Sequence, residues 1–128
     1  MSEDTTDWRE LREFKSVDLT RSFVLAWTVE SGSLLIDVDL YLCPDHALYE
    51  EPRPAEKACF RAAFIDFPHC ESAEDAATTG HLADAVKRFG AGKISGLKRT
   101  GEGRYEISGE FGKVVIRAER PMVRLKNI

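Results

Sequence analysis

Long apolar segments, cysteine pairs and reaction motifs are all missing from this sequence. No apolar run approaches the roughly 20 residues that a membrane-spanning helix needs, so no membrane partner is expected. Residues 1–7 are acidic and polar, unlike a secretory signal or a transit peptide, and we therefore expect a cytoplasmic protein. Three cysteines, Cys43, Cys59 and Cys70, leave an odd thiol, which indicates a reducing compartment and not a disulfide framework.

The length and composition are those of one globular domain. The chain has 128 residues, of which 43% are hydrophobic and 31% charged, a balance that argues against disorder. We expect a single domain over residues 1–128 because this length leaves little room for a second core.

Charge is unevenly distributed along the chain. Residues 1–84 hold 7 Lys/Arg and 18 Asp/Glu, a net of −11, whereas residues 85–128 hold 11 and 4, a net of +7. Either the basic third forms a surface for an acidic partner or nucleic acid, or the two segments interleave and neutralise each other. We favour interleaving, and the acidic pI of 5.4 argues against nucleic-acid binding.

Alternating hydrophobicity predicts a β-hairpin early in the chain. Residues 22–29 and 34–42 both alternate with a period of two, and residues 30–33, which include Gly32, form a turn between them. In the first strand one face should carry Phe23, Leu25, Trp27 and Val29. A third strand over residues 58–67 is apolar on both faces, so it should be central, and Pro68 should end it.

The remaining patterns complete an α+β fold that is mainly antiparallel β. The spacing of Trp8, Leu11 and Phe14 predicts a helix over residues 5–15 with Asp7 as its cap, and a second helix is expected near residues 74–89 with Thr79 as its cap. Short strands over residues 94–126 indicate an antiparallel meander. A curved sheet, a small open barrel or a sandwich would all satisfy this order.

The best candidate binding residues are acidic. Asp37 and Asp39 share one face of a strand, and the loop that follows adds Asp45, His46, Glu50 and Glu51. Such a group could bind a hard divalent cation or act as an acid–base pair. The simpler interpretation is that both aspartates lie on the solvated face of a half-buried strand.

A zinc site and other cofactors are not expected. Cys43 and His46 have the spacing of half a zinc site, and Cys59, His69 and Cys70 supply further ligand types. Adjacent residues His69 and Cys70 diverge in an extended segment, so they make a poor second pair. The sequence selects no catalytic residue and no cofactor.

Four segments resemble short, uncharacterised bacterial β-rich proteins. They are residues 22–27, the strand over 34–42, the loop over 46–49 and the stretch Tyr105–Gly112. The resemblance implies no established activity, although some proteins of this general kind neutralise toxins by binding them.

We therefore expect a non-enzymatic domain that acts by binding another protein, with the acidic loop over residues 45–56 as its contact surface. The alternative is a small metal-dependent or ligand-binding enzyme that uses Asp37, Asp39 and His46.

Overall fold

The computed structural model describes residues 5–47, 49, 51, 59–75 and 81–126. Strands account for 58% of the structure and helices for 12%, so the prediction of a mainly antiparallel β protein is confirmed. Among the described residues no helix has the length and apolar character to span a bilayer.

Nine strands and four helical turns are found in this part of the chain. The strands are β1 (Thr6–Asp7), β2 (Val17–Glu30), β3 (Ser33–Leu42), β4 (Phe60–Phe67), β5 (Ser72–Glu74), β6 (Gly92–Gly101), β7 (Arg104–Gly109), β8 (Gly112–Arg117) and β9 (Met122–Leu125). The helical turns are η1 (Trp8–Glu10), η2 (Arg12–Phe14), α1 (Leu82–Ala85) and η3 (Val86–Arg88).

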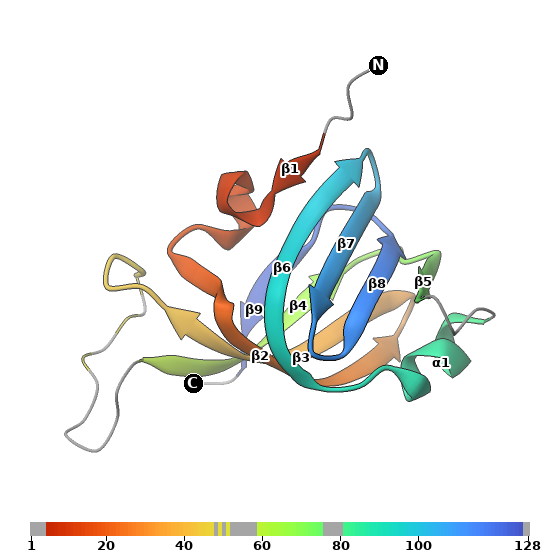
Figure 1. Cartoon of the computed structure of the whole chain (residues 1–128), viewed down its shortest axis with the longest axis horizontal. Helices are drawn as coiled ribbons and strands as arrows, with labels where there is room; N and C mark the ends of the chain where they lie inside the picture. The colour runs from red at the N-terminus through yellow and green to blue at the C-terminus, as the bar shows by residue number, and fades with distance from the viewer. Residues whose placement is uncertain (1–4, 48, 50, 52–58, 76–80, 127–128) are drawn as a thin grey trace.

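The strands form one open antiparallel sheet in the order β5-β8-β7-β6-β2-β3-β4-β9, and β1 pairs with β6. The sheet curls, so that β6, β7 and β8 lie over β2, β3 and β4 (Figure 1). Phe67 of β4 meets Tyr105 of β7 across the core, with ring centroids 5.3 Å apart. The core therefore lies between the two halves of the same sheet, and each half has one face turned outward.

The predicted hairpin is confirmed as β2 and β3. Ser31 and Gly32 form its two-residue turn with φ values of 50° and 82°, the positive pair that matches the twist of a hairpin. β4 pairs with β3 on one side and β9 on the other, so the prediction that it lies inside the sheet is also confirmed.

Two irregularities in β2 overturn the predicted face of that strand. The register with β3 shifts between Asp18 and Phe23 and again between Val24 and Ala26. The second shift sets two residue steps of β2 against one of β3, and this single extra residue reverses the alternation beyond it. Val24 and Trp27 are consequently both buried, whereas Phe23 and Leu25 are exposed. At the first shift the side chain of Ser22 takes the place of backbone pairing between β2 and β3. Its hydroxyl accepts a hydrogen bond from the Tyr41 amide and donates one to the Asp18 carbonyl.

The predicted helix over residues 5–15 is wrong. This segment contains β1 and two separate 3-10 turns, η1 and η2, with Leu11 in extended conformation between them. Trp8, Leu11 and Phe14 are all buried. Their spacing of three residues suits the three-residue turn of a 3-10 helix, which the sequence pattern did not separate from an α-helix. Asp7 does cap η1 by accepting from the Arg9 amide.

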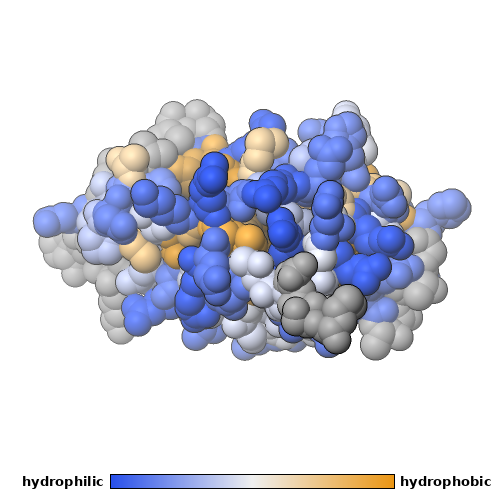
Figure 2. Space-filling model, turned by 90° about the horizontal axis from the view of Figure 1, so that it is seen from above, coloured by the Kyte–Doolittle hydropathy of each residue, from blue (hydrophilic) through white to orange (hydrophobic). Residues whose placement is uncertain are grey.

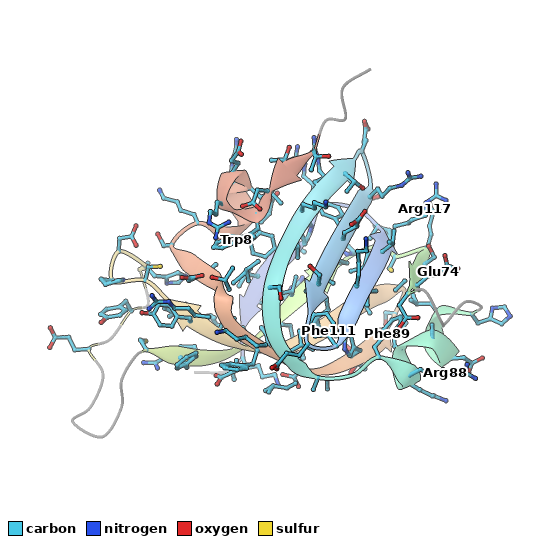
Figure 3. All side chains as sticks on the ribbon, viewed as in Figure 1. Trp8, Glu74, Arg88, Phe89, Phe111 and Arg117 are labelled. Carbon is cyan, nitrogen blue, oxygen red and sulfur yellow. The ribbon has the colours of Figure 1, made fainter. Side chains whose placement is uncertain are left out.

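The helix predicted near residues 74–89 is shorter than expected. Its first residue, Glu74, ends β5, and Thr79 lies outside the described residues. In the part of this segment that the structure describes, only α1 and η3 are helical. Phe89 follows η3 and packs against Trp27, whose Nε1 donates to the Gly90 carbonyl at 2.7 Å. Phe111 contacts the same indole, and both phenylalanines lie at the end of the sheet opposite the β6–β7 turn (Figure 3).

The predicted C-terminal meander is confirmed for β6, β7 and β8. It is wrong for β9, because this strand pairs with β4 and not with β8. This crossing brings basic residues beside acidic ones. Arg124 pairs with Asp66 at 3.0 Å and Lys126 with Asp37 at 2.6 Å. These ion pairs join the basic C-terminal third to the acidic part of the chain, as interleaving of the two segments predicts.

Candidate functional site

The outward surface of β2, β3 and β4, here called the outer face, carries the candidate site. Cross-strand register places its side chains in rows: Phe23, Asp39 and Ala62 in one row, Ala26, Asp37 and Phe64 in the next, and Tyr41 with Phe60 at one end. The opposite side of β3 presents Leu34, Ile36, Val38 and Leu40, all fully buried. The period of two in β3 thus divides core from outer face.

Aromatic side chains cluster at one end of the outer face. The ring of Phe60 lies 6.3 Å from that of Phe23 and 5.5 Å from that of Tyr41. Arg21 covers the Tyr41 ring at 5.3 Å and donates from Nη1 to its hydroxyl at 3.2 Å. The cluster spans three strands, so it forms a continuous surface and not an isolated side chain.

Hydrophobic side chains beside this cluster are open to solvent. Phe23 is 37% exposed and Leu25 53% exposed. Of the large hydrophobic residues that the structure describes, only these two and Met122 reach such exposure. The shift of register next to Leu25 is what turns it outward. Apolar side chains grouped on a surface in this way are typical of a binding site.

Asp39 lies among these apolar side chains of the outer face. It is the direct cross-strand partner of Phe23 on β2 and of Ala62 on β4. Burial raises the pKa of its carboxyl above the usual value. None of the described residues places a cation or a hydrogen-bond donor on this carboxylate. The ionised carboxylate is therefore partly desolvated, and no favourable contact offsets the cost.

Asp37, two residues earlier on the same face, has a different environment. Its carboxylate accepts from the Lys126 ammonium at 2.6 Å, and the same ammonium lies 4.6 Å from the centre of the Phe64 ring. The two aspartates therefore share a face, as predicted, but only Asp39 keeps an uncompensated charge.

The loop residues predicted to join the aspartates lie apart from Asp37. Asp45 follows the end of β3 and accepts from the Ser16 hydroxyl at 2.8 Å. The His46 amide donates to the Cys43 carbonyl at 2.9 Å, which forms a turn there. Asp37 lies five residues before the end of β3, about 16 Å along the strand. Glu51 is exposed, and Glu50 and most of the proposed contact loop lie outside the described residues.

Metal-ligating side chains do not gather in the part of the chain that the structure describes, where no three His, Cys, Asp or Glu residues are close enough to hold an ion. All three cysteines are free thiols. Burial and the carboxylates of Asp18 and Asp45 raise the pKa of Cys43, and burial raises that of Cys70 to about 11. A raised pKa suppresses the thiolate that a metal or a nucleophilic reaction requires.

The sequence did not reveal the outer-face cluster. The pattern places Phe60 in a strand that is apolar on both faces and Phe23 on one strand face with Leu25, Trp27 and Val29, and neither prediction indicates an exposed aromatic cluster. A serine within an alternating strand, here Ser22, was the one local sign that the alternation could break. Comparison of the chain with protein-family models, with curated proteins and with solved structures finds no match.

Proposed function

We propose that this chain is a non-enzymatic domain that binds another protein through the outer face of β2, β3 and β4. The observation that supports the proposal most strongly is the row formed by Phe23 and Asp39, an exposed aromatic ring beside a partly desolvated carboxylate. Leaving both in the free molecule costs stability. A contact that covers the ring and neutralises the carboxylate recovers that cost.

The side chains in the row of Phe23 and Asp39 indicate which groups a partner must present. An apolar contact is required over Phe23 and Leu25, and a lysine or arginine is required opposite Asp39. Arg21 covers Tyr41 at the border of the cluster, so the partner's basic group belongs over Asp39 and away from Arg21. The partner is therefore a protein surface with one basic side chain set among apolar ones.

Binding to the face is favoured over strand addition at an edge. The two terminal strands of the sheet, β5 and β9, have three and four residues. Edges this short offer few backbone hydrogen bonds to an added strand.

The alternative enzyme at Asp37, Asp39 and His46 has less support. The carboxylate of Asp37 is engaged by Lys126, so it is not available as the second member of an acid–base pair.

Affinity capture with matched variants tests the proposal. The wild-type chain, Leu25→Ser and Asp39→Lys are immobilised, and the proteins retained by each from a cell extract are quantified by mass spectrometry. A specific partner is retained by the wild type and loses at least about tenfold in affinity with either variant, because each removes a central contact.

Two variants distant from the outer face serve as controls. Val115→Ser removes a half-buried apolar side chain from β8, and Glu74→Lys reverses an exposed charge on β5 (Figure 3). Both should retain the partner as the wild type does. A partner lost with Glu74→Lys or Val115→Ser but kept by Leu25→Ser and Asp39→Lys would refute the proposal.

A further inference from the structure

A cavity of about 840 Å³ opens at the end of the sheet where β6 turns into β7. Its walls come from distant parts of the chain: Glu13 of η2, Pro68 after β4, Arg99 and Tyr105 of β6 and β7, Arg120 just before β9, and Met122 at the start of β9. Figure 2 views the molecule from the side of this turn and shows hydrophobic surface between hydrophilic side chains. The volume is within the range of small-molecule sites, about 300–1,000 Å³.

The polar floor of the cavity is formed by Arg99 and Tyr105. They are cross-strand partners, so their side chains leave the sheet on the same side. Tyr105 is 1% exposed and its ring packs on Phe67. Burial and then the Glu13 carboxylate raise the pKa of the Tyr105 hydroxyl, whereas the nearby Arg99 and Arg120 oppose this rise. Arg99 Nε is buried and has no acceptor in the described structure. Arg99 lines the cavity and its guanidinium carries further N–H donors, so it can meet an anionic oxygen there.

A second arginine stands at the mouth. The Arg120 side chain is 65% exposed and touches the Glu13 carboxylate at 3.4 Å, whereas Glu13 is only 16% exposed. Arg120 has five N–H donors and touches Glu13 through Nη1, so other donors of this exposed side chain can meet a ligand while the contact with Glu13 is kept. Glu102 and Glu119, the other acids of the lining, are exposed at the rim, where water screens them.

The remaining lining is apolar. Pro121 and Ala118 are buried, and Met122 is 43% exposed, with a flexible thioether that adapts to the shape of a ligand. The cavity thus combines a guanidinium floor with an apolar wall.

We infer that this cavity binds a small carboxylic acid, with its carboxylate on Arg99 and Arg120 and its hydrocarbon part against Pro121 and Met122. The planar fork of arginine matches a carboxylate, and the apolar wall favours an acid that carries a hydrocarbon part over an ion that has none. This site lies outside the outer face and does not depend on the proposed partner.

Binding of hexanoate to the full chain, measured by NMR titration of the backbone amides, tests the inference. Hexanoate should bind with a dissociation constant below about 10 mM, and the amides that shift should be those of Gly103, Tyr105 and Met122. Hexanamide and hexylammonium, which match its length without the negative charge, should bind at least about fivefold more weakly because neither pairs with a guanidinium. Inorganic phosphate, which has no hydrocarbon part to contact Pro121 and Met122, should bind at least about fivefold more weakly than hexanoate.

Substitutions at the floor complete the test. Arg99→Gln should weaken hexanoate binding by about tenfold, whereas Lys98→Gln, which removes the neighbouring charge from the opposite face of β6, should leave it unchanged. If Arg99→Gln does not fold, Arg120→Gln, at an exposed side chain, replaces it and should weaken binding by about threefold. Equal binding of hexanoate and hexanamide, shifts confined to other residues, or no binding of hexanoate would overturn the inference.

Discussion

Asp37 and Asp39 should respond in opposite directions to the same substitution. Both lie on β3, on the same face and two residues apart, but Asp37 is bonded to Lys126 at 2.6 Å and Asp39 has no recorded partner in the described structure. Asp37→Asn removes a charge-assisted contact between side chains that are 24% and 33% exposed, so it should cost about 1–2 kcal/mol. For a chain of this length that loss lowers Tm by about 3–8 °C.

Asp39→Asn should raise Tm at neutral pH. Burial raises the folded-state pKa of Asp39 above its value in the unfolded chain, so the folded state holds the proton more tightly. Stability therefore falls as pH rises through the interval between the two pKa values, and the whole loss is present above the folded-state pKa. An asparagine at this position does not ionise, so the variant does not lose this stability as pH rises. The gain of the variant should be full at pH 7 and should disappear below the pKa of an unfolded aspartate, about 3.9.

Thermal unfolding of the wild type and both variants, followed by circular dichroism from pH 3 to pH 8, measures these differences. Asp37→Asn supplies the internal control, since it has the same chemistry on the same strand. A decrease in Tm for Asp39→Asn at pH 7, or a gain that persists unchanged at pH 3, would show that Asp39 is compensated in the folded state and would refute the reasoning.

Three further predictions concern the fold. Trp27→Phe removes the 2.7 Å bond to the Gly90 carbonyl and should cost about 2 kcal/mol in urea unfolding, and an unchanged midpoint would contradict this role. Gly109→Ala places a methyl group against the Lys93 carbonyl and the Phe111 ring and should cost at least about 3 kcal/mol, whereas Gly96→Ala, where nothing lies within 4 Å, should change stability by less than about 1 kcal/mol. Cys59 is 3% exposed and Cys70 has a pKa of about 11, so both thiols should react slowly with iodoacetamide at pH 8 in the folded chain. Three thiols per chain should react after denaturation. Rapid labelling of Cys70 in the folded chain would contradict its burial.

The β-hairpin was predictable because its signals are local. Period-two alternation in β3 and a glycine in the turn specify both strands without reference to the rest of the chain. The exposed position of Leu25 was not predictable in the same way. It depends on a register shift beside Ala26, which is set by how β2 pairs with β3 and β6 at once.

The candidate sites depend on contacts between residues that are distant in sequence. Asp37 and Asp39 were correctly placed on one face, but their difference comes from Lys126, 89 residues later, which β9 brings to Asp37. The cavity at Arg99 likewise needs Glu13 and Arg120 from opposite parts of the chain. The spacing of residues in the sequence does not predict that β9 pairs with β4 instead of continuing the meander.

Methyl NMR of the labelled chain, titrated with the partner obtained by affinity capture, tests the outer-face proposal most directly. Leu25 supplies exposed methyl groups on the outer face, and Val115 supplies methyl groups on β8, remote from it. The account predicts that the Leu25 methyl signals shift and show intermolecular contacts with the partner, whereas those of Val115 stay unchanged. Intermolecular contacts at Val115 with none at Leu25 would contradict the account.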